Sequence, residues 1–273
     1  MKKIALSLFV SSFALTAFAQ TITFKVNYKP STVYTQSNLQ TTKNEVSYKA
    51  PAEILEMLTA QGIENPTTTE NKTNTTGVMT TGKLAAAEMP ITMKLSIDSG
   101  AEDKIIPDNT VIHGKVKQDG MPVFESIDAP GMDAATKDIF LKSMQATMAQ
   151  VTIPERKVKV GETFVIDTPL SLPMGPATLK MSDKATYKLI KVEAKKAYFD
   201  VSHVYTIDSV VNEQEIKGTG TGTGKVVHDI ENNFIVKQDV DMNMQMGFDT
   251  NGITLTIKAN TVSALTCTIA PAK

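Results

Sequence analysis

A run of fifteen residues near the C-terminus alternates between apolar and polar side chains, which limits the folds that this chain can adopt. The run begins at Phe234, and every second residue up to Phe248 is apolar except Gln238. A period of two predicts a β-strand with one buried face. At roughly 3.3 Å per residue this strand is about 50 Å long, so it must bend, bulge or coil around a barrel-like sheet.

Turn sequences on either side of this run predict antiparallel hairpins. Asp249 to Gly252 is typical of a hairpin turn, and the residues after it continue the same period. Upstream, 187–192 and 197–207 flank a turn at 193–196. His203 falls in the apolar row of the second segment, and we interpret it as a hydrogen-bonded core histidine rather than a base.

Four glycines alternate with threonines just before the long strand. Gly218, Gly220, Gly222 and Gly224 fall on one face of a predicted strand, and the threonines fall on the other. Because interior glycines weaken a strand, this pattern indicates that a bulky group, a helix or a ligand, lies against the bare face. The alternative is a flexible glycine-rich linker.

Two segments show helical spacing of apolar residues. The first is 51–60, with proline in its first turn and Gly62 just beyond its end. The second runs from about Asp133 to Gln150, with Phe140, Met144 and Met148 on one side. At 1.5 Å per residue it is about 27 Å long and can lie along a curved sheet.

The N-terminus predicts export. A short basic start, an apolar run from Ile4 to Phe18 and small residues before Gln20 are typical of a secretory signal peptide cleaved after Ala19. Gln20 stands where a lipidated protein has cysteine, so we expect no lipid anchor at this site. The mature chain has no second apolar run that predicts a transmembrane segment. It is predicted to be soluble, in the periplasm or outside the cell.

Residues 20–273 are expected to form a single β-rich domain, with possible halves 20–152 and 153–273. The lone Cys267 excludes an intrachain disulfide and is interpreted as a small buried apolar residue. The formal net charge is −1 and the lysines are scattered, which argues against nucleic-acid binding. No catalytic, metal or cofactor motif is recognisable, so we expect neither an enzyme nor a cofactor.

A row of methionines is the one pattern in the sequence that could bind a metal. Met242, Met244 and Met246 share one strand face, and thioethers suit Cu(I), so a Met-rich periplasmic copper-binding protein is one alternative. Soft packing around a core or a greasy cavity is the simpler interpretation, because methionine adapts to irregular shapes.

The order of these features resembles a family of uncharacterised exported bacterial β-rich proteins, a domain of unknown function. The features are the central helix, the turn in 159–164, the hairpin 187–205, the glycine run and His228-Asp229 with a turn at 232–233. The resemblance implies no activity and no catalytic residue. A looser, fold-level similarity links the chain to the half-barrel carriers that shuttle lipoproteins or lipids across the cell envelope.

Together these patterns predict a mainly β fold: a curved antiparallel sheet, half-barrel or sandwich, with one short helix and the long helix against its concave face. The leading function is a non-enzymatic envelope protein whose concave face binds a lipid-like or other apolar ligand, or the apolar segment of an envelope partner. The alternative is a structural or interaction module with a closed core. The expected ligand-binding residues are the four glycines, the methionine row and the helix stripe: Gly218, Gly220, Gly222, Gly224, Met242, Met244, Met246, Phe248, Phe140, Met144 and Met148.

Overall fold

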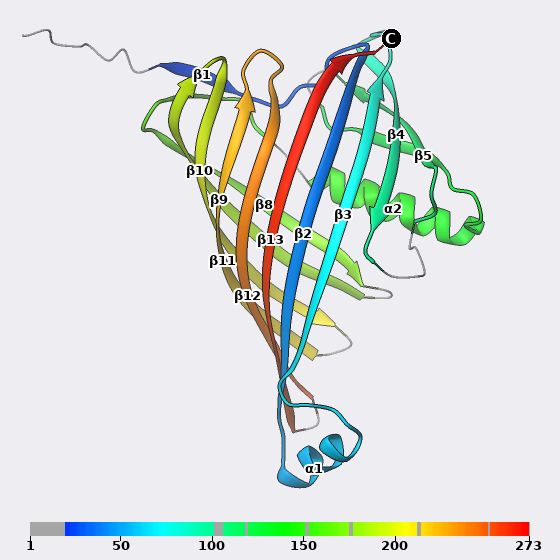
Figure 1. The fold of residues 1–273 in the computed structure, drawn as a ribbon, viewed down its shortest axis with the longest axis vertical. Coiled ribbons are helices and arrows are strands. Elements are labelled where there is room, and N and C mark those ends of the chain that lie inside the picture. The colour runs from blue at the N-terminus through cyan, green and yellow to red at the C-terminus, as the bar shows by residue number, and fades with distance from the viewer. Residues whose placement is uncertain are drawn as a thin grey trace, which may run out of the picture.

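The fold is mainly β and is built on one large open sheet (Figure 1). The computed structural model describes residues 20–100, 106–117, 120–150, 153–174, 177–211, 214–250 and 252–272. The predicted signal peptide, residues 1–19, lies outside the described residues. Eleven antiparallel strands form a curved sheet that does not close, and a two-stranded sheet and two helices complete the described part of the chain. The predicted fold class is confirmed in its half-barrel form.

All neighbouring strands of the large sheet are antiparallel. In spatial order they are β6 (Val123–Asp128), β5 (Thr110–Lys117), β4 (Glu88–Asp98), β3 (Thr67–Thr81), β2 (Thr32–Lys49), β13 (Ile253–Pro271), β12 (Phe234–Thr250), β11 (Gln214–Asp229), β10 (Lys196–Val211), β9 (Ala177–Glu193) and β8 (Thr163–Met174). The small sheet pairs β1 (Thr21–Phe24) with β7 (Arg156–Lys159), and the helices are α1 (Ala52–Ala60) and α2 (Ala134–Gln150). The pairing of β2 with β13 joins the two ends of the described chain within one sheet.

The long alternating run lies in β12, as predicted, and forms hairpins with β11 and β13. The predicted turn between β9 and β10 is made by Ala194 and Lys195, which both have positive φ, 47° and 64°. Positive φ at both central residues matches the right-handed twist of the flanking strands. Local turn chemistry therefore sets the order of these strands correctly.

The glycine row of β11 is a place of close backbone approach. A Cβ atom on Gly224 would lie 2.4 Å from the carbonyl oxygen of Asp239, and one on Gly218 would lie 2.8 Å from that of Gln245. One on Gly220 would lie 2.7 Å from Cγ of Met244. The space beside these glycines is taken by the backbone of β12 and by side chains of the adjacent strands, which only glycine allows to come so near. These contacts concern the neighbouring strand, so the expectation that a helix or a ligand lies against this face stays a prediction.

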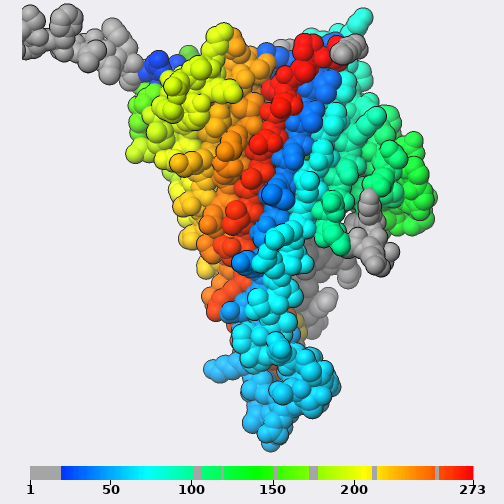
Figure 2. Space-filling model, viewed as in Figure 1, coloured from blue at the N-terminus to red at the C-terminus, as the bar shows by residue number. Residues whose placement is uncertain are grey.

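The molecule tapers toward one end. Strands β2, β3, β12 and β13 run toward this end in Figure 1, and Figure 2 shows their side chains as diagonal stripes that lead toward α1. The short helix α1 sits at this tip, between β2 and β3, and buries none of its residues. Of the described helices, none is long and apolar enough to cross a membrane.

The long helix α2 spans the opening of the sheet and contacts the two edge strands, β6 and β8. Asp133 caps its N-terminus, because the Asp133 carboxylate accepts hydrogen bonds from the backbone N–H groups of Ala135 and Thr136 at 2.9 and 3.0 Å. The Thr136 hydroxyl also donates to Asp133, and this bond is the main reason that the pKa of Asp133 is lowered. Along its length, α2 packs a stripe of side chains that includes Phe140, Met144 and Met148 against inward side chains of the sheet.

Two side-chain amides attach α2 to the sheet edges. The Gln145 amide donates to the carbonyl oxygen of Phe124 in β6. The Gln150 side chain accepts from the Ser171 N–H in β8 and donates to the Ser171 carbonyl at 3.4 Å. An edge strand exposes unpaired N–H and C=O groups, so these amides take the place of a neighbouring strand.

Two packed clusters fill the broad end of the molecule. The first lies between the small sheet and β8–β11, with Phe24 fully buried and surrounded by Phe164, Tyr187, Phe199 and His228 at ring-centroid distances of 5.0–5.7 Å. The second lies between α2 and β2–β5, and it includes Tyr34 and Cys267. Cys267 is buried, as predicted from its apolar surroundings in the sequence.

His228 is a buried histidine within the first cluster. Its Nε2–H donates to the carbonyl oxygen of Lys25 at 2.7 Å, which ties β11 to the segment after β1. Its Nδ1 is buried without a partner among the described residues. Burial lowers the pKa of His228, more than the bond to Lys25 and the nearby Asp229 raise it.

Two glycine-to-alanine variants, one in β11 and one in β3, test the close approach of β12 to β11. We expect Gly224→Ala to lower the free energy of unfolding by about 1–3 kcal/mol, because the new methyl meets a fixed backbone carbonyl. The matched control is Gly77→Ala in β3, where no atom lies within 4 Å of the added Cβ. That change should be neutral or stabilising by up to about 1 kcal/mol, through a stiffer unfolded chain. Urea unfolding at constant m-value measures both, and equal effects of the two changes would refute the close approach.

A pH titration of stability tests the environment of His228. Its folded pKa lies below the ordinary value of 6.5, so the unfolded chain binds a proton first as pH falls. Its contribution is therefore complete above about pH 6.5 and declines below it, until the folded pKa is reached. In urea titrations from pH 7.5 to 5, His228→Gln should lose less stability than the wild type. His113→Gln, a change at an exposed residue, should follow the wild type. Parallel wild-type and His228→Gln curves would contradict the assignment.

Candidate functional site

Strand register identifies the inward face of the open sheet. In β10, Val201, His203, Tyr205 and Ile207 are buried, and the residues between them are exposed. Residues directly opposite each other in an antiparallel pair share a face. The register therefore carries the inward face from strand to strand across the sheet.

The predicted glycine and methionine rows share this inward face. Gly218, Gly220 and Gly222 of β11 pair in turn with Met246, Met244 and Met242 of β12, and Gly224 pairs with Val240. Tyr205 of β10 lies opposite Gly220. The sequence-predicted residues on these two strands are thus brought together as one apolar surface.

The helix stripe lies elsewhere on the same side of the sheet. Phe140, Met144 and Met148 pack with the second cluster, under β2–β5. Met242, Met244, Met246 and Phe248 are absent from both clusters of described residues. They are half-buried rather than buried. The predicted site is therefore divided into a packed part under α2 and an incompletely covered part on β12.

A polar stripe adjoins the methionine row on the inward face. Met242 pairs with Thr261 of β13, which pairs with Thr42 of β2, and the two threonine hydroxyls hydrogen-bond at 3.1 Å. The Gln40 amide donates to the Thr42 hydroxyl at 3.3 Å. This polar stripe is made of Gln36, Asn38, Gln40, Thr42 and Asn44 of β2 with Thr261 and Ser263 of β13. Sequence reasoning missed its β2 residues because the outward residues there are mostly polar too, so hydrophobic alternation gives no signal.

A histidine and a carboxylate meet at the other border of the methionine row. Nδ1 of His203 lies 3.0 Å from both carboxylate oxygens of Asp183, and the His203 ring stacks on Tyr205 with centroids 5.6 Å apart. This confirms His203 as a hydrogen-bonded core histidine. Burial, with a smaller effect of Asp183, raises the pKa of Tyr205 and brings that of Tyr187 to about 12. Asp183 was missed, although its inward place in β9 among apolar alternates marks it as unusual.

The inward face carries almost no charge. At the inward positions of β2, β3, β4 and β9–β13, as the register assigns them, Asp183 is the one charged side chain among the described residues. The lysines and the remaining acids of these strands point outward. The inside of the sheet is therefore apolar or neutral and polar, and its outside is ionic.

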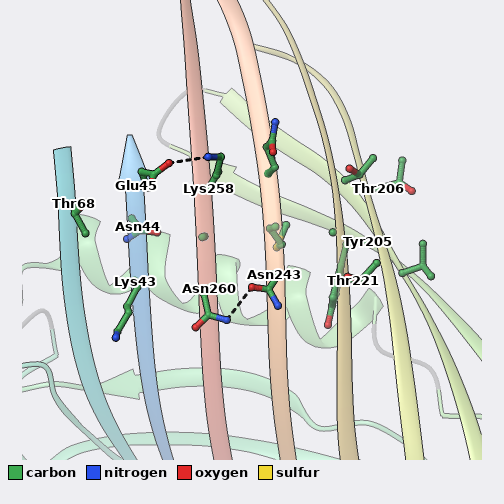
Figure 3. A pocket seen from close by; sticks show the side chains of 16 residues that line it. Lys43, Asn44, Glu45, Thr68, Tyr205, Thr206, Thr221, Asn243, Lys258 and Asn260 are labelled. Carbon is green, nitrogen blue, oxygen red and sulfur yellow. Dashed lines mark hydrogen bonds and ion pairs between the residues drawn. The ribbon is translucent and has the colours of Figure 1, made fainter. Parts of the chain in front are cut away.

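A recess lies on the outward face of the sheet (Figure 3). It holds about 630 Å³ and crosses the sheet from β3 to β10. Its sides are hydrophilic: Lys258 pairs with Glu45 at 2.8 Å, and the Asn260 amide donates to Asn243 at 3.0 Å. Of the residues predicted from the sequence to bind a ligand, Gly220 and Met244 also border this groove. It is open to solvent, and charged side chains such as Lys43 and Lys258 line it beside apolar ones such as Val204.

Reactive and metal-binding groups are sparse in the described part of the chain. It contains no group of three or more His, Cys, Asp or Glu side chains placed to hold a metal. Burial raises the pKa of the Cys267 thiol to about 11, so it stays protonated and weakly nucleophilic at neutral pH. The methionine sulfurs remain the sole basis of the copper hypothesis.

Comparison with known proteins gives no family or relative from which a function could be inferred. Neither a scan against protein-family models nor a search of the curated proteins found a match for this chain. The resemblances drawn from turn and glycine positions therefore stay predictions, and the geometry of the inward face is the basis for any function.

Proposed function

We propose that this chain is an exported, soluble, non-enzymatic protein of the cell envelope that holds an apolar ligand on the inward face of its open sheet. The signal-peptide pattern of residues 1–19 supports export. The ligand surface is the methionine row of β12 with the glycine row of β11 beside it.

The observation that carries this proposal is the incomplete burial of the methionine row. Met242, Met244 and Met246 point inward, yet they are half-buried and outside both packed clusters. Full burial of one such side chain stabilises a protein by roughly 1.5–3 kcal/mol, and this gain is only partly realised here. A hydrocarbon chain bound along the methionine row would complete the burial of these side chains. Flexible thioethers adapt to the shape of such a ligand.

The arrangement of α2 fits a binding role. It spans the gap between the edge strands β6 and β8, and no α2 residue is fully buried. A helix attached to the sheet edges by two side-chain amides can move aside at lower cost than a strand bonded along its length. We propose that ligands reach the methionine row past this helix.

The alternatives make different demands. A structural module with a closed core has no surface for a ligand and should bind no hydrophobic dye in its native state. A copper-binding protein should lose Cu(I) binding when Met242, Met244 and Met246 are changed to leucine together, whereas binding of an apolar ligand should survive this apolar replacement.

A charge placed on the inward face tests the proposal. Met244→Glu puts a carboxylate into the apolar row and should weaken binding of Nile red, a neutral hydrophobic dye, at least tenfold in a fluorescence titration. The matched control is Gln245→Glu, the next residue of the same strand, which points outward and is exposed. It should leave dye affinity within twofold of the wild type.

Circular dichroism must show that both variants keep the native β-sheet spectrum. Equal loss of affinity in the two variants, or a wild-type chain that binds no dye in its native state, would rule out the inward face as the ligand site.

A further inference from the structure

The polar stripe on β2 and β13 contains a buried acceptor that lacks a donor. The side-chain oxygen Oδ1 of Asn38 is inaccessible to solvent and has no hydrogen-bond partner among the described residues. Asn38 pairs with Leu265 of β13, so it points inward, two positions along β2 from Gln40. A buried polar atom without a partner lowers stability, and an occupant with a hydrogen-bond donor can recover this loss.

A second unpartnered acceptor lies on the same face. With the Asp183 carboxylate accepting the proton of His203 Nδ1 in the neutral ring, Nε2 carries a lone pair. This Nε2 is also buried without a partner, and His203 as a whole is only 6% exposed. In this state the unpartnered atoms of Asn38 and His203 are both acceptors, and both favour a ligand that donates hydrogen bonds.

The charge of the inward face excludes an anionic head. At the inward positions described above, the sole charged side chain is Asp183, and there is no lysine or arginine. A carboxylate or phosphate buried here would lose its hydration without gaining a counter-charge, which is costly. Hydroxyl and amide groups meet no such penalty against threonine, serine, asparagine and glutamine side chains.

The polar stripe and the methionine row lie side by side. Met242, Thr261 and Thr42 follow one another on three adjacent strands. Strands are about 4.8 Å apart, so a head on β2 and a hydrocarbon chain on β12 are within one small amphiphile's reach.

We propose that the ligand is an amphiphile with an uncharged head that donates hydrogen bonds, as a polyol or amide does, and that this head lies on the polar stripe around Asn38. The inference rests on the proposed function and specifies its ligand class.

Three ligands with the same acyl chain distinguish the proposed head group from the proposed function of binding an apolar ligand. A monoacylglycerol has a neutral donor head, the fatty acid is an anion at pH 8, and its methyl ester has no donor. Displacement of Nile red from the purified chain should give an affinity for the monoacylglycerol about tenfold or more above that for either of the others. Equal binding of all three overturns the head assignment and leaves the proposed function intact. Binding of none overturns both.

Variants on one strand locate the head. Asn38→Leu removes the acceptor and should weaken monoacylglycerol binding about tenfold, while the methyl ester stays within twofold. Gln40→Leu is a second variant on the same stripe and should act in the same direction. Ser37→Leu, at the exposed neighbouring residue of β2, is the control and should change neither ligand. If Asn38→Leu and Gln40→Leu leave the preference unchanged, or weaken all three ligands equally, the head does not lie on this stripe.

Discussion

The close approach of two strand backbones shapes the rest of this protein. Four alternate glycines in β11 let β12 come so near that a methyl group on Gly224 would sit 2.4 Å from a carbonyl oxygen. Methionine and tyrosine side chains from the flanking strands then extend over the bare row. Strong local twist bends a sheet. The bend gives this sheet an inward face, and the side chains on that face are almost all uncharged.

The strand register separates uncharged side chains on the inward face from charged side chains on the outward face. The central strands pair over long stretches with few shifts, and the β2–β13 and β10–β11 pairs have none, so one alternation governs nearly the whole sheet. A slip by one residue would exchange every inward for every outward side chain. It would bring Lys43, Glu45 and Lys258 inside, and the cost of burying them without full solvation holds the register in place. The single inward charge, Asp183, is tolerated because His203 donates to it.

The sequence predicts the C-terminal half of the fold well and the site less well. Alternation from Phe234 to Phe248 and the turns around it are local signals, and the structure reproduces them. The glycine row was recognised, but its close contact with β12 was not foreseen, because contact with an adjacent backbone depends on sheet curvature that no local pattern encodes. The polar stripe of β2 and the contact of Asp183 with His203 were missed for a similar reason: both depend on which residues meet across strands.

The two amides of α2 carry a consequence for the behaviour of the protein in solution. Gln145 and Gln150 occupy backbone groups on the two edges of the sheet. Any displacement of the helix that admits a ligand also frees both edges to pair with another chain. Opening for loading and exposure to self-association are thus one event, and a protein built in this way gains solubility from keeping the opening brief. Under the proposed function, a bound ligand that favours the closed position of the helix would also keep both sheet edges covered.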